Sequence, residues 1–253
     1  FGIMPTGAGK SVCYQVPALL LEGITLVVSP LISLMKDQVN ALVQSGVKAA
    51  YLNSSLTAGQ SAKVLALAAQ GAYRILYVAP ERLMVDAFLQ FARQAHIALI
   101  TVDEAHCVSQ WGQDFRPSYL KILEFIDRLP LRPVVAAFTA TATAEVREDI
   151  IRILRLRDPF VLTTGFDRKN LSYEVQTPDA KLPALMAFLR GKEGKSGIVY
   201  CATRKAVEAV CEALNRKGIS ATQYHAGLDN DERHANQDDF LFDRRMVMVA
   251  TNA

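Results

Sequence analysis

FGIMPTGAGKS, residues 1–11, has the composition of a loop that binds phosphate between a strand and a helix. Gly7 and Gly9 tolerate backbone dihedrals that a Cβ would forbid, so consecutive N–H groups of this turn can point at phosphate oxygens. Lys10 then supplies a positive charge for the β- and γ-phosphates, and Ser11 supplies a hydroxyl ligand for Mg²⁺. The residues predicted to bind the phosphates are therefore Thr6, Gly7, Ala8, Gly9, Lys10 and Ser11.

DEAH, residues 103–106, follows the apolar run IALITV, residues 97–102. Such a run is typical of a strand buried inside a parallel sheet. Asp103 and Glu104 would then lie at the carboxyl end of this strand, where ligands bind in open α/β sheets. One carboxylate can hold a metal ion while its neighbour orients a water molecule. We expect the Lys10 side chain and this acidic pair to converge on a single magnesium–triphosphate.

Neither motif is decisive by itself. The strict phosphate-loop pattern requires glycine at the position of Met4, and TGxGKS can also form a glycine-rich turn before a helix. A DEAH sequence after a strand can equally be a pair of surface carboxylates. The two motifs together predict a nucleoside triphosphatase.

Composition restricts the class of protein less than the motifs do. With 253 residues, of which 51% are hydrophobic, the chain can form one large domain or two smaller ones. The net charge of +3 argues neither for nor against nucleic-acid binding. No apolar run approaches the roughly eighteen residues that span a bilayer, so we expect no membrane association. The scattered cysteines favour reduced thiols over a disulfide or zinc site; they are Cys13, Cys107, Cys201 and Cys211.

Strands and helices alternate along the chain, which predicts parallel sheets connected by helices. Strands are predicted at residues 25–29, 51–55, 74–78, 97–102, 133–138, 196–201, 221–225 and 246–251. Helices are predicted at residues 31–43, 57–70, 83–94, 118–128, 144–156, 182–190, 205–217 and 229–242. Thr57 with Gln60, and Asp229 with Glu232, have the spacing of capping boxes. The expected fold is α/β, with two tandem αβα units of which the second is incomplete.

CVSQWGQDFRPSY, residues 107–119, contains Trp111, the only tryptophan of the chain. Phe115, Arg116 and Tyr119 lie in the same stretch, which is too polar to be core. Aromatic rings interleaved with arginine can stack on unpaired bases and contact phosphate, and single-stranded nucleic acid offers both. The alternative is that Trp111 and Phe115 cover a hydrophobic edge. A base-stacking loop directly after the metal carboxylates could report the nucleotide state to a bound strand.

Hydroxyl-bearing residues follow two further predicted strands. Thr139 and Thr141 could link the triphosphate site to a bound strand. Thr143 is expected to cap the next helix. Ser29 precedes another predicted helix and could bind a backbone phosphate, although a plain N-terminal capping role fits the sequence equally well.

Several stretches of the chain resemble the motifs of the RecQ DNA helicases of superfamily 2, in the same order and spacing. They are MPTGAGKSVCYQ, VVSPLISLMKDQV, YVAPERL, DEAHCVSQWGQDFRP, TATAT, FDRKNL, GIVYCATR and YHAGL. The resemblance covers essentially the whole chain. Its most specific part is the aromatic loop after DEAH, which related RNA helicases lack.

The resemblance implies two RecA-like lobes that hydrolyse ATP with Mg²⁺, move 3′ to 5′ along single-stranded DNA and unwind partly duplex DNA in repair and recombination. The first lobe would span residues 1–163, the connection residues 164–180, and the incomplete second lobe residues 181–253. In a bacterium such a protein would be cytoplasmic, at the nucleoid. The resemblance identifies no protein partner.

The resemblance also implies roles for individual residues. Asp103 would hold Mg²⁺ through its water shell, and Glu104 would orient and deprotonate the attacking water. His106 would sense the γ-phosphate and signal to the aromatic loop. The implied catalytic residues are Lys10, Asp103, Glu104 and His106, the metal-binding residues are Ser11 and Asp103, and the DNA contacts are Ser29, Trp111, Phe115, Arg116, Thr203, Arg204 and His225.

The chain departs from the family pattern in a few places. Gln113 stands where the family commonly has histidine, and Lys169 where it commonly has proline. The adenine-reading segment and the paired arginines of the family are absent, and the chain stops inside the apolar run 246–251. We therefore expect a fragment that hydrolyses ATP poorly by itself and does not unwind DNA. The alternatives are an RNA-remodelling ATPase of the same superfamily and a nucleotide-gated DNA-binding module without turnover.

Overall fold

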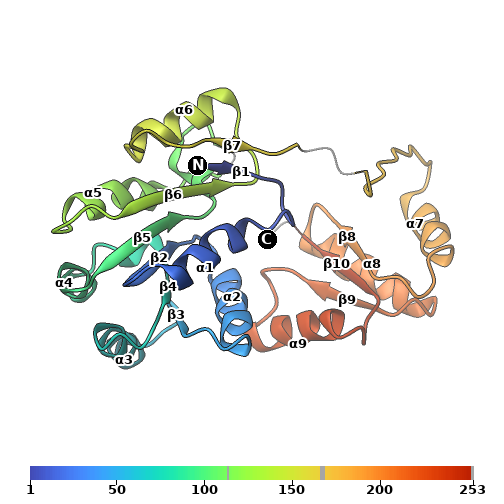
Figure 1. The fold of residues 1–253 in the computed structure, drawn as a ribbon. Coiled ribbons are helices and arrows are strands. Elements are labelled where there is room, and N and C mark those ends of the chain that lie inside the picture. The colour runs from blue at the N-terminus through green and yellow to red at the C-terminus, as the bar shows by residue number, and fades with distance from the viewer. Residues whose placement is uncertain (113, 166–168, 252–253) are drawn as a thin grey trace. The chain divides into compact units, whose positions relative to one another are not determined.

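The computed structural model describes residues 1–112, 114–165 and 169–251, and it divides the chain into two compact units (Figure 1). The first unit comprises Phe1–Lys169 and the second Asn170–Ala253. The change from one unit to the other lies within the connection predicted at residues 164–180. The predictions for Gln113 and for residues 166–168 of FDRKNL lie outside the described residues.

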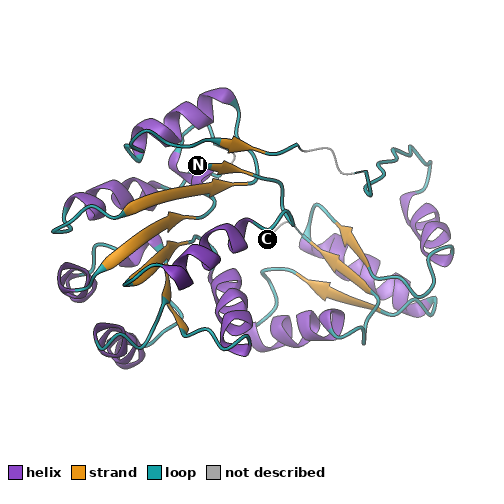
Figure 2. Ribbon diagram, viewed as in Figure 1, coloured by secondary structure: helices purple, strands orange, loops and turns teal. Residues whose placement is uncertain are grey.

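A parallel sheet of seven strands forms the centre of the first unit (Figure 2). The strands are β1 (Gly2–Ile3), β2 (Ile24–Val28), β3 (Ala49–Leu52), β4 (Ile75–Val78), β5 (Ile97–Val102), β6 (Val134–Thr139) and β7 (Leu162–Thr163). Their order is β3-β4-β2-β5-β6-β1-β7, and the pairings among the described residues are parallel. Parallel neighbours require crossover connections, which the alternation of strands and helices supplies. The predicted α/β class is confirmed.

Helices cover both faces of this sheet. They are α1 (Lys10–Leu20), α2 (Ile32–Gln44), α3 (Ala58–Ala69), α4 (Asp86–Gln94), α5 (Lys121–Asp127) and α6 (Ala144–Ile153). Side chains alternate along a strand, so Val27 belongs to the core with α1 and α2, whereas Leu26 and Val28 belong to the core with α3 to α6. The strands are apolar on both faces because both faces are covered.

Local capping patterns fix two of the helix starts in the first unit. The Thr57 hydroxyl accepts the N–H of Gln60 at 3.2 Å, and the Gln60 side chain accepts the N–H of Thr57 at 2.9 Å. This reciprocal pair confirms the first predicted capping box. Thr143 accepts the N–H of Val146 at 3.2 Å and caps α6, as predicted.

Several features of the first unit differ from the prediction. β3 is Ala49–Leu52 rather than residues 51–55, and α5 begins at Lys121 rather than at residue 118 because Pro117–Leu120 forms a 3₁₀ turn. α4 begins at Asp86 rather than at residue 83, because Pro80–Arg82 first forms a short 3₁₀ turn. β7 adds a strand at the edge of the sheet, where the N–H of Leu162 donates to the carbonyl of Phe1 at 2.8 Å. A strand of two residues is too short to show an alternating pattern, so it leaves no periodic signal in the sequence.

The second unit contains a parallel sheet of three strands in the order β8-β10-β9. Its elements are α7 (Lys181–Arg190), β8 (Gly197–Tyr200), α8 (Arg204–Arg216), β9 (Ala221–Tyr224), α9 (Asn230–Leu241) and β10 (Val247–Ala250). Val207, Cys211 and Leu214 recur at helical spacing along α8 and pack with Val247 and Val249 of β10. The second unit therefore repeats the strand–helix alternation of the first.

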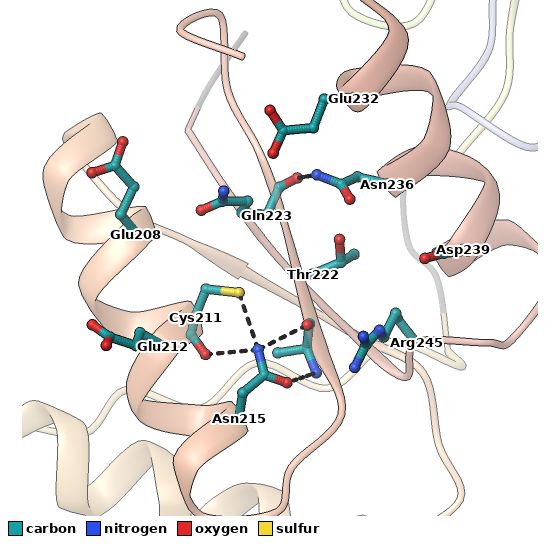
Figure 3. Close-up of a pocket in the computed structure, with 11 residues that line it drawn as sticks. Glu208, Cys211, Glu212, Asn215, Thr222, Gln223, Glu232, Asn236, Asp239 and Arg245 are labelled. Atoms are coloured by element: carbon teal, nitrogen blue, oxygen red, sulfur yellow. Dashed lines mark hydrogen bonds between the residues drawn. The ribbon is translucent and has the colours of Figure 1, made fainter. Parts of the chain in front are cut away.

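The outer edge of β9 lies beside a polar pocket of about 310 Å³ (Figure 3). Asn215 of α8 binds this edge as a neighbouring strand would: it donates to the carbonyl of Ala221 at 3.0 Å and accepts the N–H of Ala221 at 3.1 Å. Asn236 of α9 donates to the carbonyl of Gln223 at 3.0 Å. The two carboxamides occupy backbone groups through which an edge strand could otherwise pair with another chain.

The four cysteines are free thiols, and Cys13 is exposed. Within residues 1–112, 114–165 and 169–251, no group of three or more His, Cys, Asp and Glu side chains is arranged to hold a metal ion. The same residues contain no helix with both the length and the hydropathy needed to cross a bilayer.

Candidate nucleotide and nucleic-acid sites

The predicted phosphate loop connects β1 to α1 on the surface of the first unit. Thr6, Gly7, Ala8 and Gly9 are exposed, and Gly7 and Gly9 have φ values of 84° and 85°. Residues with a Cβ rarely adopt these angles, so the shape of the loop depends on both glycines. Gly9 directly precedes α1, whose first turn contains no acidic side chain. The free N–H groups of this helix start can therefore bind phosphate oxygens.

Asp103 follows β5 and is 6% exposed. Its Oδ1 accepts the N–H of Glu104 at 3.0 Å, and its carbonyl accepts the Tyr119 hydroxyl at 2.9 Å. Burial, and then the negative charge of Glu104, raise the pKa of Asp103 from 3.8 to about 6. A cation at this carboxylate would offset both effects. The Asp103 carboxylate therefore fits a Mg²⁺ site completed by phosphate oxygens and water, and Ser11 in the first turn of α1 stays its predicted second ligand.

Glu104 has a left-handed backbone, with φ and ψ both 47°. This region is unfavourable for a residue with a Cβ, and such strain is often found at functional sites. Its Oε2 lies 3.3 Å from His106 Nδ1. The hydrogen bond to His106 is the main cause that lowers the pKa of Glu104 below its usual value. Glu104 is thus an anion at neutral pH and can orient a water molecule.

Lys10, at the start of α1, acts on this acidic pair through its charge. Its Nζ donates to the carbonyl of Met4 at 3.0 Å. After the dominant causes, the charge of Lys10 also lowers the pKa of both Asp103 and Glu104. Met4, which departs from the strict motif, is only 8% exposed, so its side chain lies in the core and leaves the phosphate side of the loop open. Lys10 and the two carboxylates therefore interact electrostatically, and their convergence on one magnesium–triphosphate stays a prediction.

His106 connects the acidic pair to the end of β6. Its Nδ1 lies 2.9 Å from Thr139 Oγ1. Thr139 donates its own hydroxyl proton to the carbonyl of Thr141 at 3.1 Å, so Thr139 accepts and Nδ1 of His106 carries a proton. The side chain of Cys107, and then that of Glu104, raise the pKa of His106 to about 10, which makes it a cation at neutral pH. Sequence analysis singled out Thr139 but did not identify His106 as its partner.

The aromatic loop after DEAH presents one large ring to solvent. Trp111 is 71% exposed, so it does not cover a hydrophobic edge. Phe115 is half-buried. The Arg116 guanidinium donates to the Asp114 carboxylate at 2.9 and 2.7 Å and to the carbonyl of Pro30 at 3.1 Å. A phosphate at Arg116 would therefore compete with Asp114.

Tyr119 and Ser29 lie deeper in the protein than expected. Tyr119 is fully buried in the core of the first unit, so the expectation that this stretch is too polar for the core is wrong at this residue. Ser29 is 1% exposed, and its hydroxyl has no hydrogen-bond partner in the described part of the chain. It does not cap α2, which begins after Leu31 without a side-chain cap. A DNA contact of Ser29 stays a prediction and would require its hydroxyl to become accessible.

The second unit brings its three predicted DNA-binding residues to the carboxyl ends of β8 and β9. Thr203 caps α8 by accepting the N–H of Ala206 at 3.2 Å, and Arg204 is the first residue of that helix. His225 is 2% exposed and accepts the N–H of Gly227 at 3.2 Å. A Cβ on Gly227 would lie 3.1 Å from the His225 ring and 3.3 Å from Arg204 Cδ. Arg204 and His225 therefore meet at this glycine.

Two protein-family models match the chain. The model described as DEAD/DEAH box helicase matches residues 1–150, and the model described as helicase conserved C-terminal domain matches residues 180–253. The ATP-dependent DNA helicase RecQ of Bacillus subtilis is 45% identical over 251 residues, which cover 99% of this chain and 42% of the relative. The RecQ helicase of Pasteurella multocida is also 45% identical, and the match covers 99% of this chain and 40% of that relative. The chain thus spans about two fifths of these relatives.

Solved structures share the fold at low sequence identity. Mycobacterium smegmatis helicase Lhr, bound to single-stranded DNA and AMP-PNP, aligns with a TM-score of 0.72 and 20% identity over 98% of this chain and 37% of that one. A Saccharomyces cerevisiae Dbp5 variant, bound to Gle1 and IP6, aligns with a TM-score of 0.70 and 18% identity over 100% of this chain and 64% of that one. These structures establish the architecture as that of helicase domains.

Proposed function

The chain belongs to the DEAD/DEAH box helicase family, and we propose that it is the motor core of a RecQ-type ATP-dependent DNA helicase. The proposed protein couples ATP hydrolysis to 3′-to-5′ translocation on single-stranded DNA and unwinds duplexes in DNA repair and recombination. It would use Mg²⁺ and, in a bacterium, act in the cytoplasm at the nucleoid. The RecQ relatives support this type of helicase over an RNA-remodelling ATPase.

The observation that supports the proposal is the electrostatic interaction of Lys10 with Asp103 and Glu104, whose pKa values its charge lowers. Lys10 would leave the carbonyl of Met4, to which it now donates, and bind the β- and γ-phosphates. Ser11 and Asp103 would hold Mg²⁺, which supplies charge neutralisation for the phosphates. The raised pKa of Asp103 favours this exchange, because a bound cation would remove the cost of a buried negative charge.

Glu104 and His106 would act on the water side of the reaction. Glu104 is an anion at neutral pH and can accept a hydrogen bond from the attacking water and then its proton. His106 holds the Glu104 carboxylate and is itself held by Thr139. A change of charge at the γ-phosphate would therefore alter the hydrogen bonds that connect Glu104 to His106 and His106 to Thr139.

The DNA side of the proposal begins at Trp111. Its exposed indole can stack on an unpaired base, and base stacking on an aromatic ring is typically worth about 1–3 kcal/mol. Phe115 and Arg116 would complete this contact, with Arg116 exchanging Asp114 for a DNA phosphate. Thr203, Arg204 and His225 are the proposed DNA contacts of the second unit.

The test measures ATP turnover by the full-length gene product with oligodeoxythymidylate, with the matching oligouridylate, and with neither. Strand separation is then measured on duplexes with a 3′ or a 5′ single-stranded tail. We expect stimulation by DNA and unwinding from the 3′ tail only. Stimulation by RNA alone would establish the RNA-remodelling alternative.

Glu104→Gln is the matched variant for this test. It should bind ATP as the wild type does but lose turnover by about 10²–10⁴-fold, the usual contribution of a positioned general base. DNA binding without turnover in the wild-type protein would instead support a nucleotide-gated binding module. Turnover retained by Glu104→Gln would remove Glu104 from the catalytic role.

A further inference from the structure

A partly buried hydrogen bond connects the loop that carries Trp111 to α6. The Ser109 hydroxyl donates to Asp149 Oδ2 at 2.8 Å and accepts the N–H of Trp111 at 3.2 Å. Ser109 is fully buried, and the Asp149 side chain is 13% exposed. A hydrogen bond to a carboxylate in such a place is stronger than one between neutral groups. Asp149 thus holds the backbone of Trp111 through one serine oxygen.

The other end of this short segment is held by the same part of the fold. His106 is bound to Thr139 at the end of β6. Thr143 then caps α6, and Val146 and Ile150 anchor that helix in the core of the first unit. Residues 106–111 are therefore fixed at both ends to one continuous frame, formed by the end of β6 and by α6.

The turn after Trp111 is equally compact. The N–H of Gly112 donates to the carbonyl of Ser109 at 3.0 Å. A Cβ on Gly112 would lie 2.2 Å from the carbonyl oxygen of His106, so no larger residue fits without a shift of the backbone. The backbone around Trp111 is thus tightly held, while its ring is 71% exposed. Such an arrangement fixes the direction of the ring and leaves its faces available.

Asp149 also forms an ion pair with Arg152, whose side chain is 76% exposed. This pair lies one helical turn along α6 and does not involve the loop, so it could stabilise α6 without Ser109. An exposed ion pair of this kind contributes little to stability. The contact that distinguishes Asp149 from a plain helix-surface carboxylate is therefore the one to Ser109.

We propose that Asp149 is a positioning residue for DNA-stimulated ATP turnover: through the Ser109 hydroxyl it holds Trp111 in the direction from which a bound DNA base reaches the His106 end of the nucleotide site. The inference rests on the proposed helicase function. Asp149 touches neither nucleotide nor DNA in this scheme. It sets the geometry of the segment between them.

The principal test compares Asp149→Ala, Asp149→Asn and Glu148→Gln in the full-length gene product. Asp149→Ala should lower DNA-stimulated turnover about tenfold, the factor that corresponds to one hydrogen bond to a charged group, and leave turnover without DNA within about twofold of wild type. Asp149→Asn keeps an oxygen that accepts the Ser109 proton and should restore most of the stimulation. Glu148→Gln changes an exposed neighbour on the same helix and should behave as wild type.

Ser109→Ala tests the same bond from the other side. It should reproduce the loss of stimulation, and the double variant with Asp149→Ala should lose no more than either single variant, because both remove one connection. Equal loss of turnover with and without DNA, or failure of Asp149→Asn to restore stimulation, would mean that Asp149 has only a structural role. Additive losses would likewise overturn the proposal.

Fluorescence separates this inference from the proposed function. Trp111 is the only tryptophan among the 253 residues of this sequence. In the full-length protein, with any tryptophan outside these residues replaced by phenylalanine, its anisotropy and its quenching by acrylamide report this loop directly. Asp149→Ala should lower the anisotropy and increase the quenching, whereas Asp149→Asn and Glu148→Gln should not. Unchanged Trp111 signals in Asp149→Ala would overturn the positioning role. An absence of DNA stimulation in the wild type, with these fluorescence changes present, would refute the helicase proposal and leave the Asp149 contact standing.

Discussion

The two units alternate strands and helices in the same way but bury them differently. Every residue of β2 in the first unit is buried, whereas Ile198 and Tyr200 of β8 in the second are 53% and 67% exposed. Individual polar residues differ in burial as well, although His225 of the second unit is only 2% exposed. Asp103 of the first unit is 6% exposed, while Thr203 and Arg204 of the second unit lie exposed at the start of α8.

This difference in burial shows which unit can hold a charged side chain inside its core. A buried carboxylate such as Asp103 costs stability, and only a well-packed core can offset that cost. The first unit has such a core on both faces of its sheet, and the predicted catalytic residue Asp103 is held there by a buried contact to Tyr119. The predicted DNA-binding residues Thr203 and Arg204 of the second unit are exposed, so their polar groups cost the folded state little stability. Substitutions should therefore change the free energy of unfolding more in the first unit than in the second.

The largest expected difference between the units is the loss of stability when one isoleucine in each is replaced by alanine. Ile100→Ala removes a fully buried side chain from β5 and should lower the free energy of unfolding by about 2–5 kcal/mol. Ile198→Ala in β8 removes a half-exposed one and should cost less than about 1 kcal/mol. Urea unfolding followed by Trp111 fluorescence, with any tryptophan outside residues 1–253 replaced by phenylalanine, measures the first unit, and hydrogen exchange of the β8 amides measures the second. Equal costs would abolish the contrast between the units.

Asp103→Asn should stabilise the first unit at the expense of its function. The pKa of this carboxyl is raised from 3.8 to about 6 in the folded protein, so the native state binds the proton more tightly than the unfolded state. Its contribution to stability therefore falls as the pH rises from 4 through 6. At pH 8, without nucleotide or Mg²⁺, the asparagine should raise the free energy of unfolding by up to about 3 kcal/mol.

The control for Asp103→Asn is the same comparison at pH 4, where both side chains are largely neutral and the two proteins should differ little. Thermal unfolding at both pH values measures the effect. A stabilisation that did not change between pH 4 and pH 8 would show that the charge of Asp103 is not its cause. Loss of Mg²⁺-dependent turnover in the same variant would complete the contrast between stability and function.

Asn215→Ala should be the most damaging polar substitution in the second unit. The side chain donates to the carbonyls of Cys211 and Ala221 and accepts the N–H of Ala221. Its loss should cost about 1–3 kcal/mol and leave the edge of β9 open to pairing with another chain. Hydrogen exchange at residues 221–224 and light scattering would measure the two effects. Asn215→Asp, which keeps only the acceptor, should protect the Ala221 N–H alone.

The smallest difference in stability is expected when the N-cap threonine of one helix in each unit is replaced. Thr143 in the first unit and Thr203 in the second each accept an N–H of the third helical residue at 3.2 Å. Replacement of either by alanine should cost about 1 kcal/mol, because a cap acts within a single turn whatever core lies below it. Thermal unfolding of both variants checks this. A cap at Thr143 worth far more than that at Thr203 would show that α6 depends on Thr143 for more than its first turn.

Several features were predictable because they depend on neighbouring residues only. The run 97–102 forms β5 as predicted, and the Thr57–Gln60 capping box and the Thr143 cap are confirmed. The short strand β7 and the burial of Tyr119 were missed. β7 is too short for a periodic pattern, and Tyr119 is buried by its hydroxyl contact to the Asp103 carbonyl and by the packing of α5, which no local pattern expresses.

Most contacts that organise the candidate site could not be predicted either, because no local sequence pattern expresses them. His106 bonds to Thr139 and Ser109 to Asp149, and the two members of each pair lie far apart along the chain. Nothing in the residues around Asp149 distinguishes it from its exposed neighbour Glu148. Only the position of α6 beside the segment after DEAH makes one of the two a partner of Ser109.

The sequence by itself determined the elements and the chemistry: glycines that permit the phosphate loop, an apolar strand that ends in two carboxylates, and a single tryptophan in a polar loop. These follow from dihedral limits, periodicity and side-chain type, which act over a few residues. The tertiary structure alone decided which groups meet, because strand order in the sheet brings β1, β5 and β6 together. It also decided their charge states, since the pKa of Asp103 and of His106 depends on burial and on partners that folding supplies.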